Sequence, residues 1–316
     1  MISSYYLDNL RLKREESITK ENLEKAVWID LIDASEQDRH FIEETLDINF
    51  ASKLELEDIE ASARFFEDED GLHLHSFFFY EDEDEYADLE TVAFTIKNDQ
   101  LYSIRTRELT PFRLYRLRSL HQKLTNGNAY EVLLDIFETK IEQIADLIED
   151  TYASLEVLTR KILLSDNSSD LDVAIEELTY FEDLTSKINS SIMDTNRALS
   201  FLLRKTRLPN ELIEQARDIF RDIESIKPNN DLLFTRISFL MDASMGLINI
   251  EQNRIIKMFS VMSVIFLPPT LVASMYGMNF DDMPELHWEY GYPYAIAFMI
   301  LSAVGCLLIF KWRKWL

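Results

Sequence analysis

Small polar side chains recur at alternating steps of four and three residues along a stretch that is otherwise apolar. Between Asp242 and Ser274 this spacing selects ten positions, called the polar seam below: Asp242, Gly246, Asn249, Asn253, Ile256, Ser260, Ser263, Leu267, Thr270 and Ser274. A period near 3.5 keeps one side of a helix facing a common axis, and polar groups at membrane depth are tolerated where they face a water-filled cavity. We therefore expect the seam to line a pore made by several copies of this helix.

An alternative is that the seam only packs helices together, as Ser and Thr often do in membranes. That interpretation accounts for Ser260 and Ser263 but poorly for Asp242, Asn249 and Asn253. Two seam positions are apolar, Ile256 near one mouth and Leu267 in mid-membrane. Because rings of apolar residues gate pores by dewetting, both are candidate gates. The basic residues near that mouth are Lys257, Lys311, Arg313 and Lys314. They would add positive charge there, and they would also fix the orientation of the spans in the membrane.

Carboxylates suited to sensing a divalent cation occur outside the seam. Five are adjacent, Glu81, Asp82, Glu83, Asp84 and Glu85, and their mutual repulsion is costly unless cations are near. Asp218 and Asp222 are further sensor candidates by position, and Asp242 could form a second ion site within the stalk. A merely solvated loop is the alternative. His73 and His75 share one face of a predicted strand, but without a third ligand nearby we expect ordinary strand residues.

Two uncharged runs, 258–280 and 290–310, are each long enough to cross a bilayer. Aromatic residues near their ends (Trp288, Tyr290, Trp312 and Trp315) suit membrane interfaces. We expect a first span at about 258–278, a loop at 279–289, a second span at about 290–310 and a basic tail at 311–316. Basic residues flank the spans and the loop is acidic, so the positive-inside rule places both termini in the cytoplasm.

The rest of the chain divides into an expected α/β domain, 1–125, and a helical stalk region, 126–257. Periodicity of two predicts strands over 26–32, 71–80, 91–97 and 101–107, and short helices are expected at 38–46 and 55–66. Helical periodicity follows over 128–164, 171–205 and 210–226, with breaks at Pro209 and at 228–230. A last helix from Asp231 to about Tyr276 exceeds the bilayer thickness and must project from it.

Charge and motif content narrow the class of protein. The formal net charge is −25, all of it contributed by residues 1–256, and such a surface repels nucleic acid and attracts cations. The single cysteine, Cys306, cannot form a disulfide framework or a thiolate metal site. The first residues lack the apolar core of a signal peptide. With no phosphate loop, HExxH or nucleophile motif, an enzyme is disfavoured.

The segment Tyr276-Gly277-Met278-Asn279-Phe280, followed by Met283-Pro284-Glu285-Leu286, resembles the signature of the CorA magnesium transport family. The basic C-terminus, 311–316, is also similar to that family. Residues 56–66 and 249–257 look like the CorA of enteric-type gamma-proteobacteria. The resemblance covers the whole chain.

The resemblance implies an α+β membrane protein of the bacterial inner membrane, assembled as a funnel-shaped homopentamer. It implies influx of Mg2+, with Co2+ and Ni2+ also carried, and closure by cytoplasmic Mg2+ bound between subunits. Mg2+ would be both transported and regulatory, with no organic cofactor; the partners would be other copies of the chain and the bilayer. Because Mg2+ dehydrates reluctantly, a filter at Gly277, Met278 and Asn279 would read the hydrated ion through neutral oxygens.

Two alternatives remain open at this point. A ZntB-like Zn2+ carrier has the same fold, although the retained Met283-Pro284-Glu285-Leu286 favours Mg2+. A membrane-anchored scaffold with a coiled-coil stalk comes from a different class. Such a scaffold would not need Asn249, Asn253 and Thr270 on one seam.

Overall fold

The computed structural model describes residues 1–15, 17–50, 64–81, 87–164, 168–278 and 283–313. The chain forms two compact units: Met1–Ser165 with Asp172–Met241, and Asp166–Leu171 with Asp242–Leu316. The α/β sheet and its helices belong to the first unit, and both candidate membrane spans lie in the second. The domain limits expected after residues 125 and 257 stay predictions.

A seven-stranded sheet forms the centre of the first unit, in the order β2-β1-β3-β7-β6-β5-β4. Among the described strands, β3 and β7 pair in parallel and the other neighbours are antiparallel. The strands are β1 (Ile2–Asp8), β2 (Arg11–Arg14), β3 (Trp28–Ile32), β4 (Phe65–Asp68), β5 (Gly71–Glu81), β6 (Ala87–Lys97) and β7 (Gln100–Arg105). The four predicted strands are confirmed as β3, β5, β6 and β7. Asn98 and Asp99 both have positive φ, as a two-residue hairpin turn requires.

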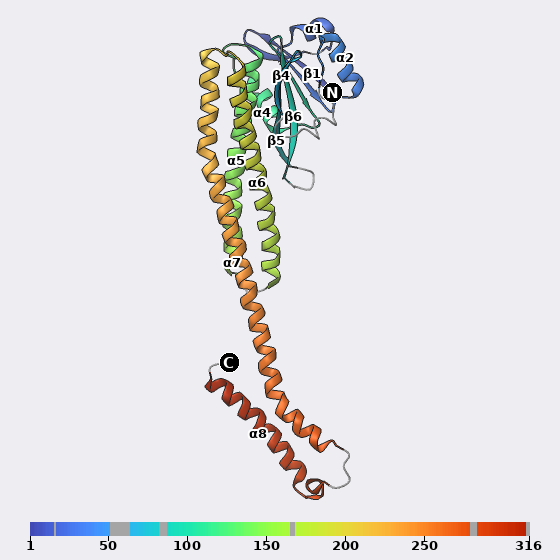
Figure 1. Cartoon of the computed structure of the whole chain (residues 1–316), viewed down its shortest axis with the longest axis vertical. Coiled ribbons are helices and arrows are strands. Elements are labelled where there is room, and N and C mark those ends of the chain that lie inside the picture. The colour runs from blue at the N-terminus through green and yellow to red at the C-terminus, as the bar shows by residue number, and fades with distance from the viewer. Residues whose placement is uncertain (16, 51–63, 82–86, 165–167, 279–282, 314–316) are drawn as a thin grey trace. The chain divides into compact units, whose positions relative to one another are not determined.

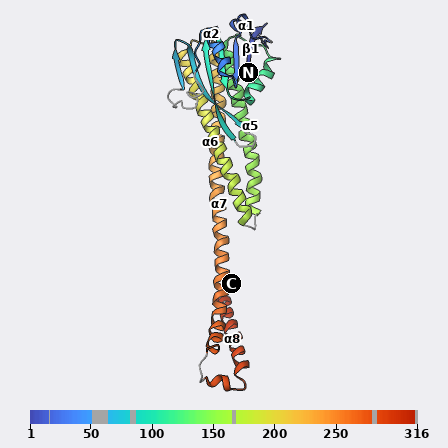
Figure 2. The same cartoon turned by 90° about the vertical axis from the view of Figure 1, so that its right-hand side faces the viewer.

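Helices cover both faces of the sheet (Figures 1 and 2). On one face α1 (Lys20–Lys25) and α2 (Glu36–Leu46) contribute Leu23 and Ile42 to a core that contains Ile29 and Leu31 of β3. On the other face lie α4 (Thr110–Ser119) and α5 (Ala129–Leu164). There the rings of Phe78 and Phe112 lie 5.3 Å apart, and those of Phe94 and Phe137 meet edge to face at 5.7 Å.

Polar contacts attach α6 (Ser168–Lys205) to the same sheet. The Asp194 carboxylate accepts hydrogen bonds from the Ser76 hydroxyl at 2.6 Å and the Phe77 N–H at 2.9 Å. The Ser191 hydroxyl donates to the Phe77 carbonyl at 2.9 Å. Because these groups are buried and mutually satisfied, they fix the position of α6 on the sheet.

The prediction of a helix at 55–66 is wrong at its C-terminal end. Phe65 and Phe66 belong to β4, where they pair with Leu74 and His73; residues 55–63 lie outside the described part of the chain. Stacking of Phe66 on the His73 ring, with centroids 4.4 Å apart, favours the strand over the local helical pattern. His73 also bonds Asp68 at 2.9 Å and Thr95 at 3.2 Å, so it is an ordinary buried strand residue, as expected.

The helix α7 runs without interruption from Asn210 to Tyr276. The sequence predicted a break at 228–230, because proline removes a backbone donor. Here Asn230 is 2% exposed and bonds the Thr185 carbonyl of α6, and Ile223 and Leu233 on either side of the proline are buried, so packing favours a continuous helix. The expected break at Pro209 is confirmed, since residues 206–209 are not helical. At 1.5 Å per residue, α7 is about 100 Å long.

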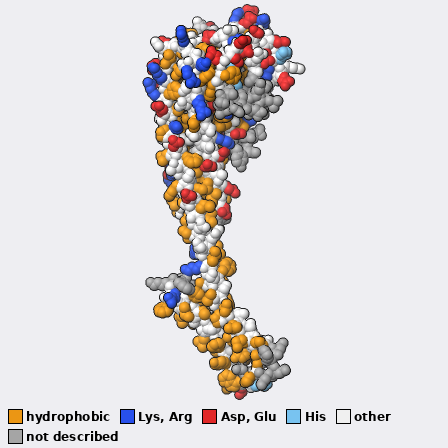
Figure 3. All heavy atoms as spheres, viewed as in Figure 1, with side chains coloured by type: hydrophobic (Ala, Val, Ile, Leu, Met, Phe, Trp, Pro, Cys, Tyr) orange, Lys and Arg blue, Asp and Glu red, His pale blue; other side chains and the backbone are white. Residues whose placement is uncertain are grey.

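The second unit contains the C-terminal part of α7, the short 3-10 helix η1 (Pro284–His287), α8 (Gly291–Trp312) and the first residues of α6. By length and composition, α7 and α8 are able to cross a membrane. Little of either span is buried within the chain. Hydrophobic side chains dominate the visible surface of this unit (Figure 3), as expected where lipid or other copies of the chain cover it.

Candidate functional site

The polar seam lies on one face of α7. Its first and last positions are 32 residues apart, a rotation of about 3,200° at 100° per residue, which is about 40° short of nine full turns. All ten seam positions are exposed in the single chain. Ile256 and Leu267, the two candidate gates, are 62% and 66% exposed. Every seam position is therefore accessible in the described part of the chain.

Three seam hydroxyls donate to carbonyls one turn back along their own helix. The bonds run from Ser260 to Ile256 at 2.8 Å, from Ser263 to Phe259 at 2.9 Å and from Thr270 to Phe266 at 2.7 Å. Each hydroxyl has one proton and two acceptor lone pairs, so its remaining capacity is that of an acceptor. The water molecules around a cation present hydrogens outward, and this part of the seam is suited to accept them.

Two of the expected filter residues lie just past the end of α7. The Gly277 N–H bonds the Ala273 carbonyl at 3.0 Å, and the Met278 N–H bonds that of Met275 at 3.3 Å. Gly277 does not have the positive φ of a left-handed helix cap. Instead, a Cβ at this position would lie 3.2 Å from the Ala273 oxygen, a tight contact.

The remaining residues of the signature are placed unevenly. Asn279, the third filter residue, lies outside the described residues, so its geometry stays a prediction. Met283 precedes η1, and Pro284, Glu285 and Leu286 lie within it. The Met283 carbonyl contacts Nδ1 of His287 at 3.3 Å.

The basic residues of the expected ring come from α7 and from the end of α8. Lys257, Lys311 and Arg313 are exposed, while Lys314 lies outside the described residues. A groove of about 330 Å3 separates the two helices here and is lined by Lys257, Ser260, Val261, Val264 and Phe310. Lys257 on α7 is thereby brought close to the α8 terminus that carries Lys311.

The sensor candidates are not brought together within one chain. Glu81 is the last residue of β5 and is exposed, and Asp82 to Glu85 lie outside the described residues. Asp218 pairs with Arg221 on α7, and Asp222 is exposed. In the described ranges, no group of three or more acidic, histidine or cysteine side chains is arranged to hold a metal ion. Accordingly, His73 and His75 belong to no such group among the described residues.

Two titratable residues that the sequence did not single out lie inside the first unit. Burial raises the pKa of Asp135 to about 7, Glu131 and Glu138 add to the effect, and a 2.7 Å bond from Gln215 opposes it. Burial lowers the pKa of Lys140 to about 8, against the influence of Asp194. The signal available for Lys140 was its place on the apolar face of the helix predicted at 128–164.

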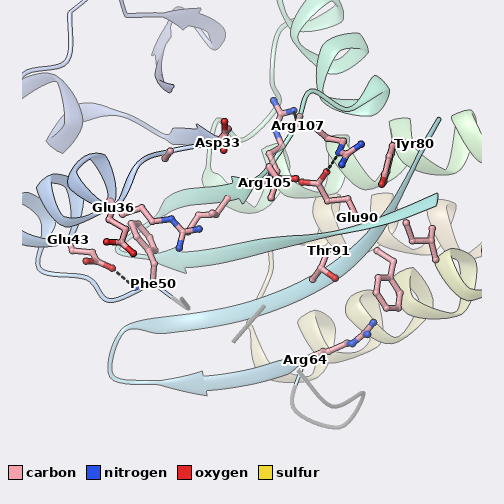
Figure 4. Close-up of a pocket in the computed structure, with 16 residues that line it drawn as sticks. Asp33, Glu36, Glu43, Phe50, Arg64, Tyr80, Glu90, Thr91, Arg105 and Arg107 are labelled. Atoms are coloured by element: carbon pink, nitrogen blue, oxygen red, sulfur yellow. Dashed lines mark hydrogen bonds and ion pairs between the residues drawn. The ribbon is translucent and has the colours of Figure 1, made fainter. Parts of the chain in front are cut away.

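A larger cavity, of about 710 Å3, lies between α2 and the sheet (Figure 4). Several of its charged groups are already paired. Glu90 binds Arg107 at 3.0 Å, and the buried Arg105 binds Asp30 at 2.7 Å. Glu43 accepts from the Phe50 N–H at 3.1 Å. Because these charges compensate one another, the cavity is a weaker candidate for a cation site than the seam.

The chain has an α/β unit, then a long helix that ends in the first of two candidate spans, and a polar seam follows that first span. These features define a class of two-span membrane proteins. The chain belongs to the family described as CorA-like Mg2+ transporter protein, whose model matches residues 24–312. This is a family of transport proteins, not of enzymes.

Two relatives and one solved structure illustrate the match. A magnesium transport protein CorA of Pasteurella multocida is 58% identical over 316 residues, and one of Yersinia pseudotuberculosis is 55% identical; both alignments cover 100% of each chain. The expected likeness to enteric-type CorA is confirmed. The complete structure of the CorA magnesium transporter from Methanocaldococcus jannaschii matches with a TM-score of 0.77, covering 100% of this chain and 99% of that one. At 20% identity it supports the fold alone.

Proposed function

We propose that this protein carries Mg2+ into the cell across the bacterial inner membrane. The observation that carries the proposal is the identity of 58% over the whole chain to a protein named for magnesium transport. Relatedness of this extent and the family match over 24–312 support a shared transported ion. The two candidate spans supply the passage through the bilayer.

The pathway we propose is a central pore lined by α7 from several copies of the chain, five as the family resemblance implies. Exposure of every seam position supports this, because a single chain leaves these polar groups facing outward. Acceptor oxygens of Ser260, Ser263 and Thr270 suit a hydrated cation. Ile256 and Leu267 would close the pore by dewetting, and Lys257 with Lys311 would add an electrostatic barrier near the cytoplasmic mouth.

Selection of the ion would take place at the outer end of α7. Carbonyl oxygens of Gly277 and Met278 and the amide of Asn279 are neutral acceptors, which match an ion that keeps its water shell. The acidic loop beyond them would concentrate cations. With both termini in the cytoplasm, a membrane potential negative inside favours entry of a divalent ion by about 4.6 kcal/mol per 100 mV.

Regulation is proposed to occur between subunits. Because the described residues of one chain form no preassembled metal cluster, carboxylates near Glu81, Asp218 and Asp222 would need partners from a neighbouring copy. Internal Mg2+ bound there would hold the closed arrangement together. Release of the ion at low internal Mg2+ would then allow α7 to move.

Uptake into liposomes that contain the purified protein tests the proposed function. Mg2+ uptake should be saturable, and competing Co2+ and Ni2+ should reduce it, whereas preference for Zn2+ would identify a Zn2+ carrier of the same fold. Asn279→Ala should abolish uptake without altering assembly. Absence of uptake of any divalent cation would leave the scaffold interpretation.

A further inference from the structure

The groove between α7 and α8 combines an apolar wall with positive charge at one end. Val261, Val264 and Phe310 provide the wall, and Lys257 lies at the end where α8 terminates. Its volume of about 330 Å3 is at the lower limit of ligand clefts, about 300–1,000 Å3. This is room for part of an acyl chain, not for a whole lipid.

The positive charges here have no counter-charge within the described residues. Neither Lys257 nor Lys311 has a carboxylate of that part of the chain within ion-pairing distance, whereas Arg254, one turn earlier on α7, lies 3.8 Å from Glu251. The hydroxyl of Ser260 already donates to Ile256, so it presents acceptor lone pairs only. Lys257 lines the groove, and Lys311 directly follows the lining residue Phe310 in the chain, so an anion at this end would draw on both ammonium groups.

The position of the groove determines which anion can reach it. Val261 and Val264 lie inside the first span, and Phe310 is near the end of the second. In a bilayer, the end of the groove at Val264 would face lipid hydrocarbon and the end at Lys257 would face the headgroups. Basic pockets between transmembrane helices on the cytoplasmic side are known to hold anionic headgroups. A molecule with an apolar chain and a phosphate satisfies both halves of the groove at once.

We propose that the α7–α8 groove is a binding site for an anionic phospholipid, with the phosphate between Lys257 and Lys311 and one acyl chain against Val261, Val264 and Phe310. The site borders the polar seam at Ser260, but its ligand is a lipid and not the transported ion. The general preference of basic residues for the cytoplasmic side explains where Lys257 and Lys311 lie but requires no ligand. The proposal adds a specific ligand for both lysines.

Native mass spectrometry of the full-length protein, released from a neutral detergent, tests this proposal. Phosphatidylglycerol should bind in preference to phosphatidylcholine. Lys257→Gln and Lys311→Gln should each weaken phosphatidylglycerol binding about fivefold, from the loss of one lysine–anion contact. Arg254→Gln is the matched control and should leave binding unchanged. Equal binding to the lysine variants and the parent protein would overturn the proposal.

A second set of variants tests the apolar half of the groove. Val264→Trp should fill it and reduce phosphatidylglycerol binding, while Leu271→Trp, exposed elsewhere on the same span, should not. Inorganic phosphate tested at matched concentration should bind far more weakly than the lipid. The proposal fails if phosphate binds as well as the lipid, or if assembled protein binds no lipid because a second copy covers the groove. Neither measurement depends on transport.

Discussion

Asn230 of α7 donates a hydrogen bond from Nδ2 to the backbone carbonyl of Thr185 on α6, at 3.0 Å, two residues after Pro228. This contact joins two helices at the point where the sequence predicts a break in α7. The helix that carries the polar seam is therefore continuous with the helix that packs against the α/β unit. A displacement at the N-terminal part of α7 has a covalent helical route to the seam.

Replacing Asn230 should weaken this connection. We expect Asn230→Ala to lower the free energy of unfolding by about 1 kcal/mol, because one buried hydrogen bond is lost. Thermal unfolding of the full-length protein in detergent measures the change. Asn229→Ala, an exposed neighbour, should have no measurable effect; an equal loss for both variants would mean that the contact itself contributes nothing.

Asp135 should make stability depend on pH. Its folded-state pKa of about 7 lies above the ordinary 3.8, so between about pH 4 and pH 7 the folded protein holds a proton that the unfolded chain has released. Stability contributed by this group is present in acid and is lost as the pH rises through 7. Asp135→Asn should raise the unfolding temperature most above pH 7 and little at pH 4. The corresponding gain in the free energy of unfolding has an upper limit of about 4 kcal/mol.

The control for Asp135 is Asp146→Asn, on an exposed position of the same helix. Unfolding temperatures of both variants and the parent, followed from pH 4 to pH 8, separate the two sites. A pH-independent gain for Asp135→Asn would show that better packing, not removal of a buried charge, stabilises the variant.

The acidic run at Glu81 should be needed for closure by internal Mg2+. Changing Glu81 to Glu85 to their amides should shift inhibition toward higher internal Mg2+, because fewer carboxylates remain to bind the ion between subunits. Uptake into vesicles preloaded with graded Mg2+ measures the shift. A chain with five exposed acids of α6 neutralised controls for net charge: Asp170, Asp172, Glu176, Glu182 and Asp183. An inhibition curve that stays in place would remove this run from the sensor.

Ile256 should contribute an apolar barrier on the seam. Ile256→Ser should admit water and ions when the pore is closed, so Mg2+ leak at high internal Mg2+ should rise several-fold. Ile255→Ser changes the same residue type about 100° around the helix and should leave the leak unchanged. If the Ile256→Ser and Ile255→Ser proteins are equally tight, the barrier lies elsewhere.

The sequence predicted those parts of the fold that depend on local pattern. Alternation around Gly71 to Tyr80 led to a correct strand, because side-chain period is a local property. The helix through Pro228 was missed because the contacts that favour it, such as the bond from Asn230 to Thr185, join residues far apart in the chain. β1 and β2 were also not predicted; their short, mixed segments pair only within the sheet.

The candidate site divides in the same way. Spacing alone placed the seam on one face of α7, since a helix converts sequence period into direction. It could not show that Gly277 avoids a tight contact with Ala273, or that burial displaces the pKa values of Asp135 and Lys140. Those properties depend on neighbours brought close by folding. The carboxylates of the sensor remain the least constrained, because the partners expected for them belong to another copy.

The central claim is that Mg2+ passes along the polar seam, and charged thiol reagents test it most directly. In a Cys306→Ala background, cysteine is placed at Ser263 on the seam or at Met262, which is exposed off the seam. A positively charged methanethiosulfonate should stop Mg2+ uptake into liposomes by the Ser263→Cys protein and spare the Met262→Cys protein. Uptake that persists after Ser263→Cys is labelled, or that is blocked equally at both positions, would contradict a pore lined by this face of α7.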